Sequence, residues 1–398
     1  MAHVPRATRV TSMPEVPSLA TSIVSLLMHV LASQDHSSTG IPKGKDGRRK
    51  RCWRKEFAGR RRISGVREAI MPVNVQLDVQ LVERARAEGF ARPPKRKVPC
   101  PIVDIHAHAP AGPVAAPLYE AARLYGITRL AAISTLDDAL QLKQAYPETE
   151  MIPRLEFEHL SDPERFVERN VQLVRQAAAK GARIIKMWFA PRFVARTGKR
   201  MDDPLLDPIF KEIEAQGLGV LTHVSDPDVW FERVYTDVKL YGTKADQYPQ
   251  LEHRLAAHPR IPFLAAHMGG DPEHLDHLAE LLERYPNLYL DTSATKWIVR
   301  ELGKQPEAAR DFFKQYKDRI LFGTDQVAIK DPEPFRYTSR YWIHQLFWET
   351  DVVCPLPIED PDADGPPILR GINLPEDVLP WIYYKNAARV FGIPVEEH

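Results

Sequence analysis

Residues 102–108 read Ile-Val-Asp-Ile-His-Ala-His, an apolar run that ends in two histidines two positions apart. In a β-strand the side chains of residues i and i+2 lie on the same face, so Asp104, His106 and His108 are expected on one side of the strand. Two imidazoles held side by side at a strand end form half of a site for zinc or a similar ion. Such a pair also occurs as ordinary hydrogen-bonded histidines, so its meaning depends on the rest of the chain.

From residue 101 onward, short apolar runs rich in β-branched residues alternate with stretches of helical pattern. Asp162 before Pro163 predicts the start of one helix, and Asp271 before Pro272 predicts another. Eight strand–helix units over about 290 residues predict a parallel (β/α)8 barrel, the TIM-barrel fold. A doubly wound open sheet is the alternative, but no Gly-rich phosphate loop follows any strand. The expected strands are 102–108, 129–134, 150–157, 183–189, 219–225, 261–268, 288–293 and 319–325.

Polar residues close four of these apolar runs: His106 and His108 in the first, His223 in the fifth, His267 in the sixth and Asp325 in the eighth. The carboxyl ends of barrel strands meet at one face, where active sites of this fold lie. Three histidines and a carboxylate would hold one divalent metal, most simply Zn²⁺, with a position left for water. The alternative is a set of separate histidines that only satisfy hydrogen bonds.

Such an ion would lower the pKa of its bound water from about 16 toward 7 and polarise a carbonyl group. A histidine beyond the metal ligands, or an aspartate beside the water, would then move the proton. Asp104 lies one pleat deeper than His106, and we expect it to orient a ligand histidine through its other ring nitrogen.

Aromatic and basic residues follow several strands and are candidate substrate contacts. Trp188 and Arg192 follow the fourth strand, Trp230 the fifth and Trp297 the seventh. Arginine and aromatic side chains suit a small, carboxylated, planar or lactone-like substrate, through paired hydrogen bonds and stacking. The alternative is that rim arginines are simply solvated.

Six stretches of the chain resemble the amidohydrolase superfamily, in particular its amidohydrolase-related branch, which includes aminocarboxymuconate-semialdehyde decarboxylase. The resemblance implies a TIM-barrel enzyme over about 101–393 in which His106, His108, His223 and Asp325 are metal ligands. It also implies that His267 acts on the substrate or its water. The stretches are DIHAH (104–108), DDPLLDPIFKEIEAQGLGVLTHV (202–224), AHMGG (266–270), ERYPNLYLDTS (283–293), RILFGTDQ (319–326) and YKNAARVFGI (384–393).

The expected activity is hydrolysis of an ester, lactone or amide by metal-activated water, with Asp325 or His267 handling the proton. Non-oxidative decarboxylation, a carboxy-lyase reaction, is the alternative, because the same ligand set serves both reactions in this branch. Lys186, at the end of the fourth strand, lies where two-metal members of the superfamily carry a carboxylated lysine. It is therefore a bridging ligand for a second metal, a substrate contact or a structural lysine.

Residues 1–70 differ in composition from the rest, since they contain 14 of the 54 Lys and Arg but 5 of the 53 Asp and Glu. This basic extension, with the run Lys43–Arg62, is expected to be a disordered leader, or a start placed upstream of the natural Met71. The alternatives are an export segment, or an arm by which an inactive barrel binds nucleic acid or a membrane surface. Nucleic acid is not the expected partner.

Residues 71–100 are expected to form a lead-in helix (77–89) and a linker before the barrel, 101–398. The three cysteines are odd in number and far apart, which fits a reducing, cytoplasmic compartment. No apolar run approaches the roughly 18–20 residues of a membrane span. The long segment 326–375, after the eighth strand, is an insertion expected to form either a lid or substrate wall, or a homodimer contact. Its aromatic residues are Phe335, Tyr337, Tyr341, Trp342, Phe347 and Trp348.

Overall fold

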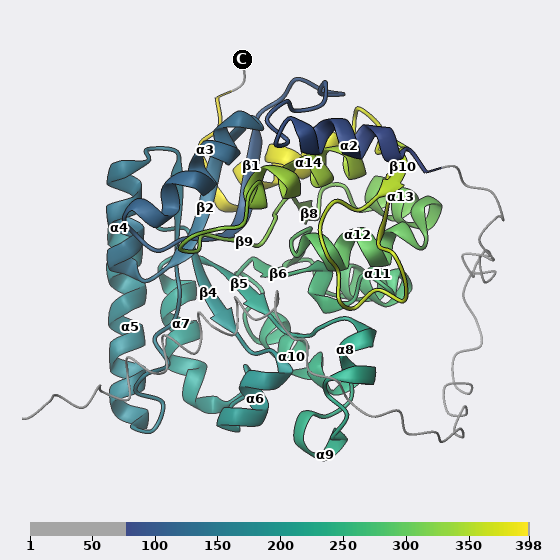
Figure 1. Ribbon diagram of the computed structural model, residues 1–398. Coiled ribbons are helices and arrows are strands. Elements are labelled where there is room, and N and C mark those ends of the chain that lie inside the picture. The colour runs from purple at the N-terminus through teal and green to yellow at the C-terminus, as the bar shows by residue number, and fades with distance from the viewer. Residues whose placement is uncertain (1–76, 397–398) are drawn as a thin grey trace, which may run out of the picture. The chain divides into compact units, whose positions relative to one another are not determined.

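All eight expected strands are present in the computed structural model, which describes residues 77–396 (Figure 1). Consecutive strands pair in parallel within two sheets, one of β1 to β3 and one of β4 to β8. Six of the eight are shorter than expected. The bounds are β1 Ile102–His108, β2 Ile127–Ser134, β3 Thr149–Pro153, β4 Ile184–Trp188, β5 Gly219–His223, β6 Phe263–Ala265, β7 Leu288–Asp291 and β8 Ile320–Leu321.

Backbone contacts at two seams close the strands into a barrel. Between β3 and β4, Arg154 bridges to Lys186 in parallel, and the amide of Leu155 donates to the carbonyl of Lys186 at 3.0 Å. Between β8 and β1, the amide of Ile105 donates to the carbonyl of Phe322 at 2.9 Å. A short strand, β9 (Gln326–Val327), also pairs with β1. The (β/α)8 barrel is thereby confirmed, and an open sheet is ruled out.

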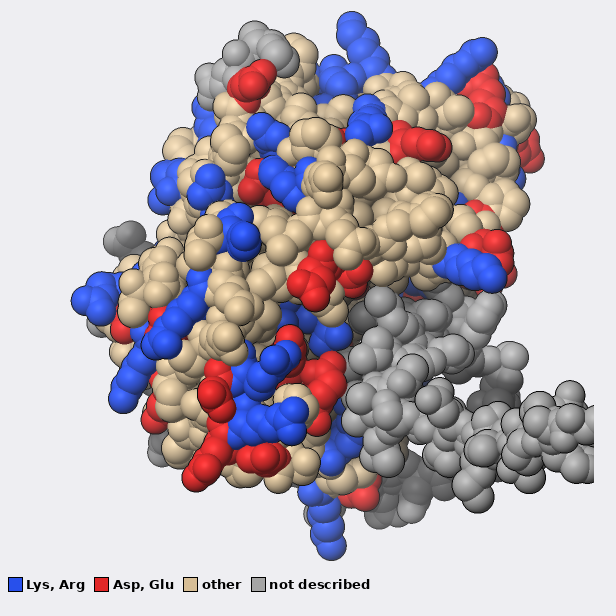
Figure 2. Space-filling model, turned by 90° about the vertical axis from the view of Figure 1, so that its left-hand side faces the viewer, with Lys and Arg blue, Asp and Glu red and all other residues tan. Residues whose placement is uncertain are grey.

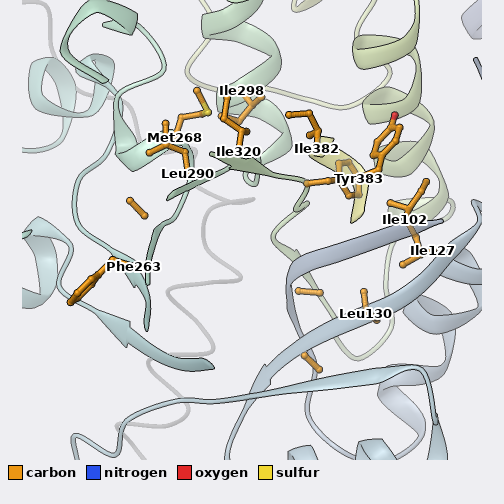
Figure 3. Close-up of a cluster of buried hydrophobic side chains, with 14 of the residues drawn as sticks. Ile102, Ile127, Leu130, Phe263, Met268, Leu290, Ile298, Ile320, Ile382 and Tyr383 are labelled. Carbon is orange, nitrogen blue, oxygen red and sulfur yellow. The ribbon is translucent and has the colours of Figure 1, made fainter. Parts of the chain in front are cut away.

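Two apolar clusters hold the barrel together. The smaller cluster gathers buried side chains from seven of the eight strands, including Ile105, Leu221 and Leu321, and the C-terminal helix α15 (Asn386–Phe391) packs against it. The larger cluster joins the strands to the helices around them, and Figure 3 shows part of it. Both faces of each strand are therefore buried, which explains the nearly continuous apolar runs of the sequence.

The helices lie around the strands (Figure 1). On the face shown in Figure 2, basic and acidic side chains of the described residues are interspersed. Helix α5 begins at Pro163 after its cap Asp162, as expected. Helix α11 begins only at Leu275, so the start expected at Asp271 is wrong by several residues. The helices are α2 Val79–Ala87, α3 Ala116–Leu124, α4 Leu136–Ala145, α5 Pro163–Ala179, α6 Pro191–Thr197, α7 Asp207–Ala215, α8 Asp228–Arg233, α9 Val238–Tyr241, α10 Pro249–Ala257, α11 Leu275–Arg284, α12 Thr295–Gly303, α13 Pro306–Gln315, α14 Arg336–Glu349 and α15 Asn386–Phe391, with 3₁₀ turns η2 Pro113–Ala115, η3 Pro204–Leu206, η4 Ala245–Gln247 and η5 Met268–Gly270 and the π-helical turn η6 Trp381–Lys385.

The segment after β8 divides into two parts. Its first part is α14, which carries five of the six aromatic residues singled out in the sequence, and all five are buried in the larger cluster. Only Phe335, at 46% exposure, lies open. These five rings are therefore core, neither a substrate wall nor a dimer contact. The second part is a hairpin of β10 (Val353–Pro355) and β11 (Ile368–Arg370), joined by the acidic, Pro-rich turn.

The leader predicted for residues 1–70 lies outside the described residues. Helix α2 is capped by Asp78, whose carboxylate accepts from the amide of Leu81 at 2.9 Å. The segment that follows is tied to α14, because Arg96 donates to Glu349 at 2.8 Å. No helix among residues 77–396 has the length and apolar character needed to cross a membrane.

Replacing Asp162 with alanine is expected to lower the free energy of unfolding by about 1 kcal/mol, because the side chain accepts from the amide of Arg165 at the start of α5. The midpoint of urea unfolding would measure the change. Glu168→Ala, at an exposed position inside the same helix, is the matched control and should change the midpoint far less. Equal shifts for the two variants would contradict the capping role.

Candidate metal centre

Three of the five polar residues predicted at strand ends meet at one point of the barrel. His106 and His108 come from β1, and Asp325 follows β8. Asp325 Oδ1 lies 3.1 Å from His108 Nε2 and 3.4 Å from His106 Nε2. The ligand atoms of the three residues all lie within 4.8 Å of one another. Two imidazole nitrogens and a carboxylate oxygen at this spacing are a donor set for a divalent cation.

The state of Asp325 shows that these residues fit a metal ion. Its Oδ1 atom is buried and has no hydrogen-bond donor among the described residues, which is costly for a carboxylate oxygen. Burial would raise the pKa of Asp325, but the His106 and His108 imidazoles outweigh it and hold that pKa well below its usual range. His108 remains 13% exposed in its side chain, whereas His106 is fully enclosed. The donor set therefore keeps one side open to solvent.

His106 is oriented by Asp291 and Ser293, two residues at the end of β7 that the sequence analysis did not single out. His106 Nδ1 lies 2.9 Å from Asp291 Oδ2 and 2.9 Å from Ser293 Oγ. Burial lowers the pKa of His106 to about 4, so the ring is neutral near pH 7. With its Nδ1 proton directed at Asp291, the ring presents the Nε2 lone pair to Asp325. The sequence signal for this contact is that the apolar run 288–293 (LYLDTS) ends in the polar residues Asp291 and Ser293.

Asp104 does not make the ring contact that was expected of it. Its carboxylate accepts from the amides of His106 (3.2 Å) and Thr324 (3.1 Å) and from the hydroxyl of Tyr341 (3.0 Å). Burial raises the pKa of Asp104 to about 7. Asp104 therefore fixes the backbones that carry His106 and Asp325, while Asp291 orients the ring.

His267 lies beside His106, with ring centroids 5.1 Å apart. Its Nδ1 atom is 2.7 Å from Ser293 Oγ, and Ser293 donates its own proton to Asp291. Because the hydroxyl has one proton, it accepts from His267 Nδ1, which leaves the lone pair on Nε2. Burial lowers the pKa of His267 to about 3, so this ring is neutral too.

His223 is not among the donors that lie within 4.8 Å of one another in the described chain. Its ring packs against His267 at 4.7 Å, and its Nε2 atom lies 2.8 Å from Asp226 Oδ1. The other oxygen of Asp226 accepts from the hydroxyl of Tyr235 at 2.6 Å. Burial and Asp226 hold the pKa of Tyr235 well above its usual value, so the hydroxyl stays a donor. Nδ1 is the nitrogen that His223 has left for a ligand.

Lys186, in β4, is buried beside the centre. Its Nζ atom lies 3.3 Å from His106 Nε2. Burial lowers the pKa of Lys186 to about 8, although Asp325 and Asp291 oppose the shift. The amine thus lies next to the donor set, within reach of a bound ion or of a substrate.

The loops that carry these residues have a strained backbone. His267, Ala294 and Asp325 have positive φ angles of 58°, 68° and 56°, although none is glycine. Gly270 permits the close approach of the loops after β5 and β6, because a Cβ atom there would lie 2.0 Å from the carbonyl oxygen of Ser225. Such outliers gather where a fold positions functional groups.

The four candidate substrate contacts form a continuous wall of side chains beside the histidines. Trp297 packs against His267 at 5.5 Å and against His223 at 6.3 Å. The ring of Trp188 meets His223 at 6.3 Å, and the ring of Trp230 meets Trp297 at 5.3 Å. The guanidinium of Arg192 lies over Trp230, 4.8 Å from the ring centroid.

The solved structures that the chain resembles share little sequence with it. An uncharacterised TIM-barrel protein, Bb4693 from Bordetella bronchiseptica, is 16% identical, with a TM-score of 0.48 over 74% of this chain and 99% of that one. The 5-carboxyvanillate decarboxylase LigW from Sphingomonas paucimobilis is 17% identical (TM-score 0.41; 69% and 82%). A probable 2-pyrone-4,6-dicarboxylic acid hydrolase from Acinetobacter baumannii is 13% identical (TM-score 0.41; 73% and 99%). No curated protein matches the chain.

The sequence profile of the amidohydrolase family matches residues 103–393. The matched region takes in the eight strands, the donor set around Asp325 and the aromatic wall. The chain therefore belongs to the amidohydrolase family and is an enzyme.

Proposed function

We propose that the chain is a metal-dependent hydrolase, with one divalent ion, that acts on an ester, lactone or amide of a small carboxylated substrate. The observation that supports this most directly is Asp325 Oδ1, which is buried without a hydrogen-bond donor and faces Nε2 of both His106 and His108. A divalent cation would remove the cost of burying that oxygen. His223 completes the proposed ligand set through Nδ1.

The bound ion, which we propose to be Zn²⁺, would polarise a carbonyl group and make water acidic enough to ionise near pH 7. His267 is the proposed proton acceptor, because Ser293 fixes its Nδ1 atom and leaves the lone pair on Nε2. Asp325 is the second candidate acceptor. Trp188, Arg192, Trp230 and Trp297 are the proposed substrate contacts.

Lys186 has two proposed roles. In the first it contacts the substrate from the floor of the site. In the second its amine is carboxylated and bridges two ions, which the 3.3 Å separation from His106 Nε2 would allow. The number of ions bound per chain separates these roles.

Decarboxylation at the same centre is the second candidate function. Arg192, stacked over the indole of Trp230, would suit a carboxylate, the group that every carboxy-lyase substrate carries. A cytoplasmic location and a disordered leader over residues 1–70 remain proposals from composition, as does the alternative of a nucleic-acid-binding arm.

Elemental mass spectrometry of the purified protein is expected to find about one divalent ion per chain, mostly zinc. His106→Ala and Asp325→Ala should each lose it, since each removes a donor from the set. His253→Ala, at an exposed histidine of α10, is the matched control and should retain the ion. Two ions per chain would place a carboxylated Lys186 in the centre. A protein that binds no ion after reconstitution would contradict the proposal.

Asp291→Asn is expected to weaken zinc affinity about 10- to 100-fold, because the amide would turn a second donor toward His106 Nδ1. Competition with a chromophoric chelator would measure the affinity. Asp311→Asn, at an exposed carboxylate of α13, is the control for lost charge. Equal affinities for Asp291→Asn and the unmodified protein would show that Asp291 does not support the ligand.

Product analysis should distinguish the two reactions. With planar carboxylated esters, lactones and amides in isotopically labelled water, a hydrolase is expected to place the solvent oxygen in the product. Release of carbon dioxide from an aromatic acid, without that label, would favour the carboxy-lyase instead. Each activity should disappear in Asp325→Ala, and activity that survives this substitution would come from a contaminant.

A further inference from the structure

Lys244 is a mostly buried cation on which three carboxylates converge. Its Nζ atom lies 2.7 Å from Asp228 Oδ1. The same atom lies 2.9 Å from Asp271 Oδ1 and 3.2 Å from Glu273 Oε2. The side chain of Lys244 is 14% exposed, and that of Asp271 only 2%. Burial would lower the pKa of Lys244, but the three carboxylates outweigh it and hold that pKa above its usual value. The amine is therefore charged, and removing it would leave buried carboxylates unpaired, which is costly.

The four charged residues join two neighbouring loops of the barrel. After β5 the chain leaves the barrel at Asp228, forms α8 and α9, and returns at Lys244 directly before η4. We name residues 228–244 the β5 excursion. Asp271 and Glu273 belong to the loop after β6, and the amide of Asp228 donates to Glu273 Oε1 at 2.8 Å. Lys244 thus ties the two ends of the β5 excursion to each other and to the next loop.

The β5 excursion packs on the barrel through a small apolar cluster of its own. Trp230 and Tyr235 meet Trp297 in this cluster, which is separate from the two clusters that hold the barrel. Further along the excursion, Val238 and Leu240 are 57% and 50% exposed. A segment with so little apolar burial opens more easily than the core does. Its position therefore depends on how its two ends are fixed.

The β5 excursion bears directly on the orientation of His223. Tyr235, which lies between α8 and α9, donates its hydroxyl proton to Asp226 Oδ2 at 2.6 Å. The other oxygen of Asp226 lies 2.8 Å from His223 Nε2. The hydroxyl reaches Asp226 only while the excursion keeps its place. The ring of His223 is therefore held through the excursion.

The loop after β6 carries His267 in the same way. The amide of Gly270 donates to the carbonyl of His267 at 2.9 Å, and the amide of Asp271 donates to that of Met268 at 3.1 Å. Asp271 is thus joined to His267 by one compact turn. The rings of His267 and His223 lie 4.7 Å apart, and the loops behind them meet at the amine described above.

We propose that Lys244 is a positioning residue that holds the β5 excursion against the loop after β6, and thereby keeps His223 and His267 at their separation. The proposal rests on the proposed function, in which His223 is a metal ligand and His267 is the proton acceptor. Lys244 contacts neither the ion nor the substrate in it. Its effect passes through Asp228 and Asp271.

This role requires the charge of Lys244. Without the amine, Asp228 would keep His274 as a partner, at 2.8 Å, and Asp271 would keep His277, at 2.7 Å. The carboxylates of the two loops would then repel each other across the vacated space, since like charges in a partly buried site are poorly screened. The end of the β5 excursion would move away from the loop after β6.

Hydrogen exchange of the metal-free protein, followed by mass spectrometry, tests whether Lys244 holds the two loops. Lys244→Met is expected to speed the exchange of amides in residues 226–245 and 267–274 about tenfold or more, with no change in the strands. Lys239→Met, at an exposed lysine of α9, is the matched control and should change nothing. Unchanged exchange in the two loops would overturn the proposal. So would faster exchange throughout the strands, because Lys244 would then only stabilise the fold as a whole.

A second variant distinguishes charge from packing. Lys244→Met/Glu273→Gln removes one of the negative charges that the amine had paired, and its Gln retains a carbonyl for the amide of Asp228. It should recover part of the protection that Lys244→Met loses, because the two changes are coupled. A double variant that exchanges faster than Lys244→Met would show that the charge of Lys244 is not what holds the loops.

Zinc affinity, measured by competition with a chromophoric chelator, tests the effect on the centre. Lys244→Met is expected to bind zinc about tenfold more weakly with an unchanged number of ions per chain, because losing the orientation of a ligand typically costs 10- to 100-fold. Lys239→Met should bind as the unmodified protein does. Unchanged zinc affinity in Lys244→Met, together with faster exchange of the loops, would show that Lys244 does not position His223 and would overturn the proposal.

The two measurements also separate this proposal from the proposed function. If the unmodified protein binds no zinc but the two loops exchange faster in Lys244→Met, the proposed function fails. The role of Lys244 in holding the loops behind His223 and His267 is then still supported, because hydrogen exchange is measured without metal.

Discussion

The candidate centre depends on one buried carboxylate, Asp291. Burial would raise its pKa, but His106 and the hydrogen bonds from His106 and Ser293 hold that pKa below its usual range. One oxygen accepts from the amides of His267 (2.8 Å) and Ser293 (3.0 Å), and the other from His106 Nδ1. A buried charge is tolerated only when it is paired in this way. The same bonds tie β1, β6 and β7 together and direct the free lone pairs of His106 and His267 into the site.

The loops that carry these residues adopt a backbone conformation that is locally unfavourable. A left-handed backbone at residues such as His267 and Asp325 costs roughly 1–3 kcal/mol each. The surrounding contacts determine the conformation nevertheless, since the amide of Asp325 donates to the carbonyl of His106 at 2.7 Å. The eight parallel strands stabilise the fold and offset this cost. The strands therefore provide stability, and the loops after them carry the functional groups.

The sequence was sufficient for the barrel and for part of the centre. Short apolar runs rich in β-branched residues located all eight strands, and the rule that strands meet at their carboxyl ends brought His106, His108 and Asp325 together. Asp104 was expected to orient a ligand histidine, but the His106 ring is held by Asp291, which strand alternation could not indicate because it relates only neighbours along the chain. Asp291 lies 185 residues away from His106, and its register against β1 follows from barrel closure, which no local pattern contains. The contacts of Asp362 with Trp230 and Arg233 of α8 are equally remote in sequence.

The segment after β8 shows how one stretch of sequence serves two purposes. Helix α14 is buried around most of its circumference, polar residues such as Arg336, Gln345 and Glu349 included, and its tyrosines and tryptophans pack inside the fold. The turn between β10 and β11 is acidic at residues 360–364 and has no apolar side that it could bury, so it is held by Arg300, Trp230 and Arg233 instead. Those partners belong to the loops and helices after β5 and β7, on the same side as the candidate centre. Because residues 360–364 bury no apolar side chain, these polar contacts fix the turn, whereas α14 is fixed by packing in the core.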